Sequence, residues 1–327
     1  MLTMEERASV LEQADQLWMR WDLHALNDML SALPMEELLN EPQLGYRLAS
    51  VLMLLHYYDR ASAMIRAVRS HAESVGNDRI CRRIMIVDAD VCMLTGRLAD
   101  AQKKCHLALE MASRSGDQAT LSVANNNLGI IASICREWDE AIVGYTRGLI
   151  AAQRIGDASL IAAAYRNLAL TYREMGFVRT AEANLEQEME ILRPLGSLRM
   201  IGSEVERAFL HHVAGDAALA EATIRRALAS ARSNDLPREV GECLRVLGIV
   251  LARDEPEDSL ACFREAVPLA QAAQNPLLEA EVLEEWAVLE HRRNNAAEAA
   301  DLATRSKEIY LSMGADRRAD RVDERMA

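Results

Sequence analysis

The chain has 327 residues, half of them apolar, and its 50 acidic and 37 basic residues give a net charge of −13 at pH 7. So acidic a surface repels phosphate backbones, and we expect no direct binding to nucleic acid. No run of eighteen apolar residues and no cleavable leader occur, so we expect a cytoplasmic protein without membrane association. Alanine and leucine dominate over β-branched runs and only 7 prolines occur, which favours an all-α fold.

The first predicted element is a helical pair that caps the chain over residues 1–34. Apolar residues recur at helical spacing from Val10 to Trp18 and again from Leu23 to Leu33, and Pro34 ends the second helix. The pair is shorter than the units that follow. A short, atypical first unit is expected at the end of a repeat array.

Residues 42–314 are predicted to form seven helix pairs, because one pattern of small and large residues recurs about every 40 positions. A small residue near the start of each second helix lets the two helices of a pair approach closely. These residues are Ala61, Ala101, Ala141, Ala181, Ala220, Ser259 and Ala299. Four positions further stand the side chains expected to fill the space between units: Ile65, Cys105, Tyr145, Leu185, Ile224, Phe263 and the smaller Ala303.

Glycines predict how the first four units end. Left-handed helix ends are expected at Gly76, Gly116, Gly156 and Gly196. The residues after them supply turn or capping oxygens, and these are Asn77, Asp117, Asp157 and Ser197. Residues 315–327 read as a helical tail rich in arginine and acid. The expected architecture is therefore one all-α solenoid over residues 1–327, with a continuous core.

The repeated unit resembles a known one. Leu128-Gly129, Ala141 twelve residues after the glycine and Tyr145 four beyond it are similar to the tetratricopeptide repeat, although that repeat is usually about 34 residues long. The resemblance implies a right-handed superhelix of helix-turn-helix units with a concave groove.

A narrower resemblance lies at residues 25–61, which are similar to the start of the sensor superhelix of MalT-type transcription regulators. The residues that carry it are Leu33, Pro34, Glu36, Leu38, Pro42 and Leu44. In that family an ATPase module precedes the superhelix and a helix-turn-helix module follows it. The chain has no G-x-x-x-x-G-K-[ST] phosphate loop and ends after the tail, so neither ATP switching nor DNA reading is expected.

Motifs of catalysis and metal binding are missing from the sequence. No H-E-x-x-H, G-x-S-x-G or glycine-rich dinucleotide loop occurs. His211 and His212 are adjacent, but neighbours on a helix point about 100° apart, so packed or groove-lining histidines are favoured over a metal site. The six cysteines have no paired spacing and are expected to be reduced core residues. We expect no enzyme activity, no metal and no cofactor.

One stripe on the first helix of each unit is expected to be exposed and to face the concave groove, the only sizeable recess predicted. Arg166 and Arg173 on this stripe are expected to be unpaired and to need an anion. An alternative is that the apolar members merely pack against neighbouring units. Asn127 and Asn167 are expected to form hydrogen bonds across the unit boundary. The candidate groove residues are Tyr46, Met53, Asp90, Met93, Asn126, Ile130, Ser133, Arg166, Leu170, Arg173, Phe209, His212, Arg245 and Glu284.

The sequence favours a protein-interaction scaffold or adaptor, with a regulatory role, that binds a protein or peptide segment in this groove. Apolar side chains down its middle with Asn126, Arg166 and Arg173 beside them suit a helix or extended peptide that offers apolar anchors and an acidic group. The alternative is a MalT-like sensor of a small molecule or peptide that signals through self-association. Four tryptophans, seven tyrosines and three phenylalanines are few for a sugar site. The oligomeric state is not predicted.

Overall fold

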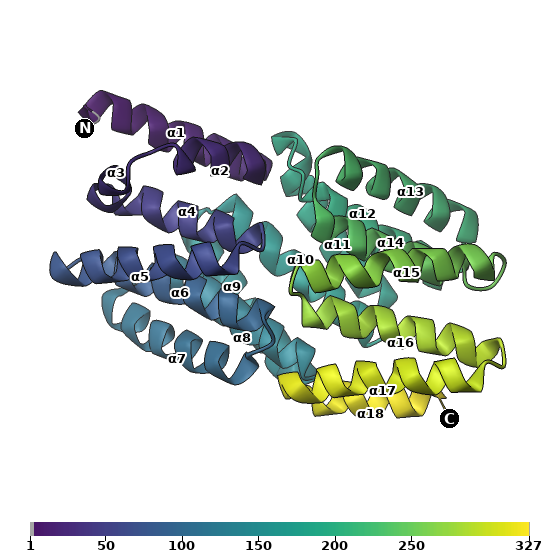
Figure 1. Cartoon of the computed structure of the whole chain (residues 1–327). Coiled ribbons are helices and arrows are strands. Elements are labelled where there is room, and N and C mark those ends of the chain that lie inside the picture. Colours follow the sequence, from purple (N-terminus) through teal and green to yellow (C-terminus); the bar gives the residue numbers. More distant parts are fainter. Residues whose placement is uncertain (1–2, 327) are drawn as a thin grey trace.

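The computed structural model describes residues 3–326, and every regular element in that part of the chain is a helix. Residues 1–2 of the predicted cap and residue 327 of the predicted tail lie outside the described residues. Figure 1 shows the helices as a series of antiparallel neighbours. Their bounds are α1 Met4–Arg20, α2 Leu23–Ser31, α3 Met35–Asn40, α4 Pro42–Leu54, α5 Tyr58–Ser74, α6 Asp78–Leu94, α7 Leu98–Ser115, α8 Gln118–Ile134, α9 Trp138–Ile155, α10 Ala158–Glu174, α11 Val178–Leu192, a 3-10 helix Arg193–Leu195, α12 Met200–Val213, α13 Ala217–Ser233, α14 Pro237–Leu251, α15 Pro256–Ala272, α16 Pro276–Arg292, α17 Ala296–Met313 and α18 Asp316–Met326.

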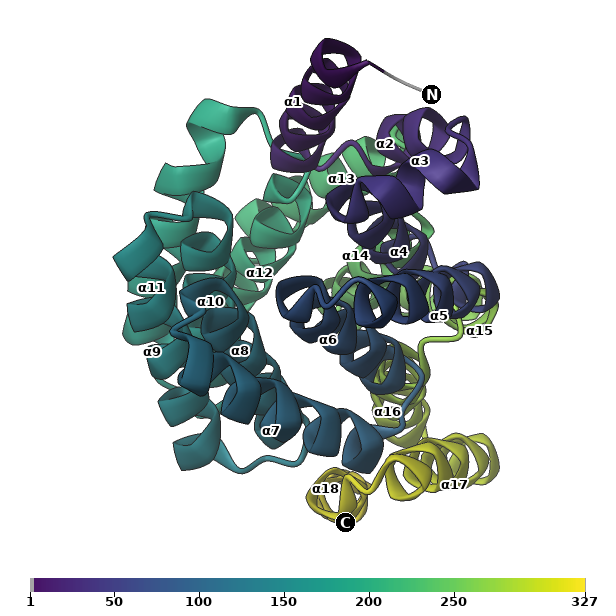
Figure 2. The ribbon, with the colours of Figure 1, turned by 90° about the vertical axis from the view of Figure 1, so that its left-hand side faces the viewer.

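From α4 onward the helices alternate between two layers that wind around a common axis. Figure 2 looks along this axis and shows α8, α10 and α12 closer to it than α9 and α11, and α14 closer than α15. The even-numbered helices α4 to α16 thus form the inner layer, and the odd-numbered helices α5 to α17 form the outer layer. The short α3 between the predicted cap and the first unit was not expected from the sequence.

The predicted small residues are buried where each outer helix begins. All seven, from Ala61 to Ala299, are at most 1% exposed, and each is the fourth residue of its helix. The large residues four positions further, from Ile65 to Phe263, are at most 3% exposed, and Ala303 is 7% exposed. The sequence spacing therefore predicted the packing between units correctly, because close approach at the small residues brings the large ones into contact with the next layer.

Glycine is required where the inner helix of a unit meets this large residue. A Cβ atom added at Gly129 would lie 2.7 Å from the ring of Tyr145, and one at Gly248 would lie 2.5 Å from the ring of Phe263. Both rings are almost completely buried and cannot move aside freely. The two units thus pair a missing side chain on one helix with an aromatic ring on the other.

We expect Gly248→Ala to lower the free energy of unfolding by about 1–2 kcal/mol. Overpacking costs about 1–3 kcal/mol, and the better helix propensity of alanine returns up to about 1 kcal/mol. In a Phe263→Leu background the same alanine should cost nothing, because the ring that it meets is gone. Urea unfolding of the four variants of this cycle measures the difference, and an equal loss in both backgrounds would contradict the packing argument.

Helix ends follow the predicted chemistry in three of the four units. Asn77, Asp117 and Asp157 accept hydrogen bonds from the backbone N–H groups three residues further, at 3.1–3.2 Å. All four predicted glycines have positive φ, from 58° to 68°. Ser197 differs, because its Oγ accepts from the Arg199 N–H at 3.4 Å before α12 begins. There the side chain shapes a turn and does not cap the helix.

Successive turns of the superhelix touch along two seams. At the first seam the Leu198 N–H donates to the Arg20 carbonyl at 2.9 Å, and His24 Nε2 donates to the Asp235 carbonyl at 2.9 Å. At the second seam, α18 lies against the end of α8, where Arg318 Nε donates to the Ile134 carbonyl at 2.9 Å. The first seam joins the predicted cap to the connections on either side of unit five, and the second joins unit three to the predicted tail.

A buried carboxylate interrupts the repeat pattern in α11. Glu188 is 0% exposed at a position where the other units carry valine, alanine, glycine or serine. Its nearest cation is Arg166, with Nη1 at 3.9 Å from Oε1, and neither of its oxygens has a hydrogen-bond partner among residues 3–326. Burial raises the pKa of Glu188 above its ordinary value, because the charged form loses its hydration. Arg207, which also departs from the pattern, pairs with Glu204 at 2.5 Å.

The six cysteines are free. Four of them are buried, as the sequence predicted, whereas Cys81 and Cys135 are half-buried. Within residues 3–326 no helix is long and apolar enough to cross a membrane. No group of three or more histidine, cysteine, aspartate or glutamate residues in the same part of the chain could hold a metal ion.

Candidate functional site on the inner face

All fourteen candidate residues lie on the inner helices, from Tyr46 on α4 to Glu284 on α16. The expectation that they form an exposed stripe is wrong. Met53, Arg245 and Glu284 are buried, and the other eleven are half-buried. The superhelix winds tightly enough for neighbouring units and α18 to cover the face that periodicity alone leaves open to solvent. We call these fourteen residues the inner face.

Hydrogen bonds between units account for part of its polar character. Asn167 Nδ2 donates to Asn126 Oδ1 at 3.0 Å, and Asn127 Nδ2 donates to the carboxylate of Asp90. Both asparagines thus bond across the unit boundary, as predicted. Burial raises the pKa of Asp90 to about 7, although the hydrogen bond from Asn127 opposes the shift. This carboxylate is therefore partly protonated near neutral pH.

The expectation that Arg166 and Arg173 are unpaired is wrong. Arg173 lies 2.8 Å from Glu174 and 3.2 Å from Glu206, and its guanidinium stacks 4.4 Å from the ring centroid of Phe209. Arg166 is less fully satisfied. Its closest carboxylate is Glu188 at 3.9 Å, and its Nη1 is buried without a hydrogen bond to any of residues 3–326. Arg173 and Arg245 likewise each keep at least one buried guanidinium nitrogen without a hydrogen bond in this part of the chain, and Arg166 differs from Arg173 in having its nearest carboxylate as far away as 3.9 Å.

Arginines of α18 neutralise the carboxylates of the inner layer. Arg318 pairs with Glu281 at 2.9 Å, and Arg321 pairs with Glu174 of α10 at 3.2 Å. Arg325 binds Glu284 at 2.6 Å and Glu285 at 2.7 Å, both on α16. We call these contacts the α18 ladder.

The α18 ladder bridges helices that are distant in sequence. Arg321 contacts both α10 and α16, with 3.8 Å to Glu284. Although burial disfavours its charged form, Arg173, Arg318 and Arg321 hold the pKa of Glu174 down at about 2, so the ladder is ionised at neutral pH. Arg173 and Glu284 were among the candidates from the sequence, whereas Glu174 and the arginines of α18 were not. The available signal was arginine at positions 318, 321 and 325, which fall on one face of a helix.

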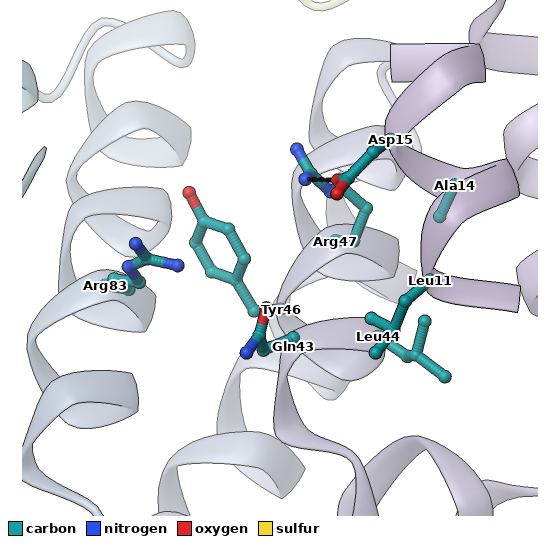
Figure 3. Close-up of a pocket in the computed structure, with 8 residues that line it drawn as sticks. All are labelled: Leu11, Ala14, Asp15, Gln43, Leu44, Tyr46, Arg47 and Arg83. Atoms are coloured by element: carbon teal, nitrogen blue, oxygen red, sulfur yellow. Dashed lines mark hydrogen bonds and ion pairs between the residues drawn. The ribbon is translucent and has the colours of Figure 1, made fainter. Parts of the chain in front are cut away.

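Tyr46 lies on the first inner helix, α4, and His212 lies near the end of α12. Figure 3 shows Tyr46 in a small recess between α1, α4 and α6, with Arg83 on one side and the ion pair of Arg47 and Asp15 on the other. His212 lies near Phe209, with ring centroids 6.3 Å apart, and burial lowers its pKa below the ordinary value. It is a packed, neutral histidine at pH 7.

Comparison with known proteins gives a fold and no close relative. No protein-family model and no curated protein matches the sequence. Among solved structures, a Rap protein in complex with competence and sporulation factor superposes with a TM-score of 0.64 at 13% identity, over 98% of this chain and 96% of that one. NprR in complex with its cognate peptide NprX gives 0.59 at 13% identity, over 88% and 82% of the two chains.

A third structure of similar fold contains a tetratricopeptide repeat sensor. A signal transduction ATPase with numerous domains from Pyrococcus horikoshii, with a tetratricopeptide repeat sensor, gives a TM-score of 0.55 at 16% identity. This chain is covered over 87%, and that one over 43%. The fold is a tetratricopeptide-like solenoid. Its units are longer than the usual repeat of about 34 residues, because both helices of a typical unit here have 17 or 18 residues.

Proposed function

We propose that this tetratricopeptide-like solenoid is a regulatory interaction protein that binds a segment of a partner protein or a peptide on its inner face. The observation that supports it most directly is the half-buried row of Ile130, Leu170 and Phe209 beside Arg166, whose Nη1 has no hydrogen bond to any of residues 3–326. Apolar anchors beside one cation suit a short amphipathic segment with an acidic group. Two structures of similar fold, those of the Rap protein and NprR, contain a bound factor or peptide.

The other predictions from the sequence stay predictions. They are the cytoplasmic location and the absence of catalysis, metal, cofactor, nucleic-acid and membrane binding. The divisions of the chain at residues 1–34, 42–314 and 315–327 also stay predictions. A fold of this kind supports many functions, so catalysis is decided by the site and not by the architecture.

Variants of the inner face test the proposal. Peptides selected from a displayed library should bind the wild type, and isothermal titration should give affinities about tenfold or more weaker for Arg166→Gln and Leu170→Ala. The arginine supplies the charged hydrogen bond and the leucine an apolar contact. Leu107→Ala on α7 is the matched control, since Leu107 is 48% exposed on the outer layer. Its affinity should equal that of the wild type.

Thermal unfolding of each variant separates a lost contact from a lost fold. A library without any binder, or selected peptides that bind Arg166→Gln and Leu170→Ala as tightly as the wild type, would contradict the inner-face assignment. Binding that is lost in Leu107→Ala alone would move the site to the outer layer.

A second candidate function is a sensor of a small molecule or peptide, as the MalT-type resemblance of residues 25–61 implies. The tetratricopeptide repeat sensor of similar fold supports it, as does a cavity of about 280 Å³ at the first seam. This cavity also corrects the expectation that the groove is the only sizeable recess. The sensor differs from the first proposal because it requires a ligand-dependent change of molar mass in solution, which light scattering measures.

A further inference from the structure

The cavity at the first seam lies between segments that are far apart in the sequence. Leu54, Leu55 and His56 come from the end of α4 and the turn after it, and Arg238 comes from the first turn of α14. The end of α15 closes the cavity with Leu269. Closure of the superhelix creates this space, because neither turn of the solenoid encloses it alone. Its volume of about 280 Å³ is near the lower end of the usual range for small-molecule sites, which is about 300–1,000 Å³.

His56, in the wall of the cavity, has a ring nitrogen without a partner among the described residues. His56 Nδ1 lies 2.8 Å from the Tyr58 hydroxyl, whereas His56 Nε2 is buried without a hydrogen bond to any of residues 3–326. Burial lowers the pKa of His56 to about 4 and raises that of Tyr58 to about 12, so both groups are neutral at pH 7. When the hydroxyl donates to Nδ1, Nε2 carries the ring hydrogen and is a donor that lacks an acceptor. A buried donor left unpaired destabilises the fold, and a bound acceptor would remove that cost.

A cation lines the same cavity. Arg238 is half-buried and forms no ion pair or hydrogen bond with any of residues 3–326. Its charge lowers the pKa of His56 further, after burial, which places the two groups in each other's field. The neighbouring carboxyl, Glu239, is a weakened anion, since burial raises its pKa above the ordinary value. Asp235 adds a second carboxyl to the wall, and the groups that can hold an anionic oxygen are Arg238 and His56.

The apolar part of the wall is formed mainly by leucines. Leu54, Leu55, Leu236 and Leu269 line the cavity, and Leu236 is 4% exposed. A ligand that fills this space must offer a short hydrocarbon body to the leucines and an anionic group to the polar side. A sugar or a nucleotide would leave hydroxyl groups against leucine and lose their hydration without replacement.

We propose that the first seam binds a small monocarboxylic acid, with its carboxylate on Arg238 and His56 Nε2 and its apolar chain among the four leucines. The ligand bridges two turns of the superhelix, so it stabilises the closed arrangement in which they touch. It thereby biases the inner face, which those same turns carry, toward one conformation. This site is separate from the inner face and does not depend on partner binding there.

Thermal unfolding with octanoate and 3-phenylpropanoate tests the proposal on the full chain. Each acid should raise the melting temperature of the wild type in a concentration-dependent way, and octanamide, which keeps the shape without the charge, should raise it much less. Arg238→Gln should bind octanoate about tenfold or more weakly in isothermal titration, because it loses the charged, bidentate contact. Ala272→Trp places an indole in the cavity and should abolish the shift. Ala261→Trp is the matched control, on an exposed position of the same helix away from the cavity.

Three outcomes would overturn the assignment. They are an unchanged melting temperature with both acids at millimolar concentration, an equal shift with octanamide, and an octanoate shift that persists in Ala272→Trp. Each outcome bears on the cavity alone, because the inner-face proposal is measured with peptides. A wild type that binds octanoate but selects no peptide would support the cavity and contradict the inner face.

Discussion

Replacing Arg318 with alanine is expected to lower the free energy of unfolding by about 3–5 kcal/mol, the usual cost of removing one partner of a buried ion pair. The side chain of Arg318 is 9% exposed, lies 2.9 Å from Glu281 and donates to the Ile134 carbonyl at the second seam. Burial alone would lower its pKa, but the Glu281 carboxylate raises it above the ordinary value. Alanine leaves that carboxylate with Arg245, at 3.6 Å, as its remaining partner. Urea unfolding followed by far-UV circular dichroism measures the loss.

Arg305→Ala is the matched control for this variant. Arg305 is 44% exposed and lies 3.8 Å from Asp301 one turn away, so its loss should change the unfolding free energy by less than about 0.5 kcal/mol. If the two variants lose equal stability, the α18 ladder does not hold the superhelix closed. A large loss in Arg318→Ala alone would identify α18 as part of the folded core.

Local spacing explains why so much of the fold was predictable. Close packing of a helix pair depends on a small residue such as Ala141 and a large one such as Tyr145 four positions later, and both lie in one stretch of sequence. The same is true of Asp117, which caps α8 through a bond to Thr120 N at 3.2 Å. These features repeat in each unit, so a single sequence shows them several times. The placement of Asn127 and Asn167 at unit boundaries followed from the same regularity.

Closure of the superhelix was not predictable in this way. The contacts at the seams join residues from different turns, such as His24 with Asp235 and Arg318 with Ile134, and no periodicity relates them. The curvature of the superhelix is the sum of small rotations between successive units, and the residue types of a single unit do not specify its rotation. The inner face was therefore expected to be exposed, and Arg173 was expected to be unpaired. Closure of the superhelix both covers the inner face and brings carboxylates to Arg173.

Because Asp90 is covered on the inner face, the stability of the folded protein is expected to depend on pH. Its pKa is raised from an ordinary value near 3.8 to about 7 in the folded state, so protonation favours folding. The stabilising contribution is fully present below about pH 4 and is lost as the pH rises through about 7. Asparagine keeps the shape, still accepts from Asn127 and never ionises. Asp90→Asn should therefore be more stable than the wild type at pH 8.

The size of this effect follows from the shift. One pKa unit corresponds to about 1.4 kcal/mol, so a shift of about three units sets an upper limit of about 4 kcal/mol, and half-burial of the side chain favours a smaller gain. Urea midpoints at pH 4.5, 6.0 and 8.0 should show the advantage of Asp90→Asn growing with pH. Asp100→Asn, on an exposed position of α7, should show no such growth. An advantage that is constant from pH 4.5 to 8.0 would mean that Asp90 is hydrated on the inner face, and the tight winding that buries it would then be wrong for α6 and α8.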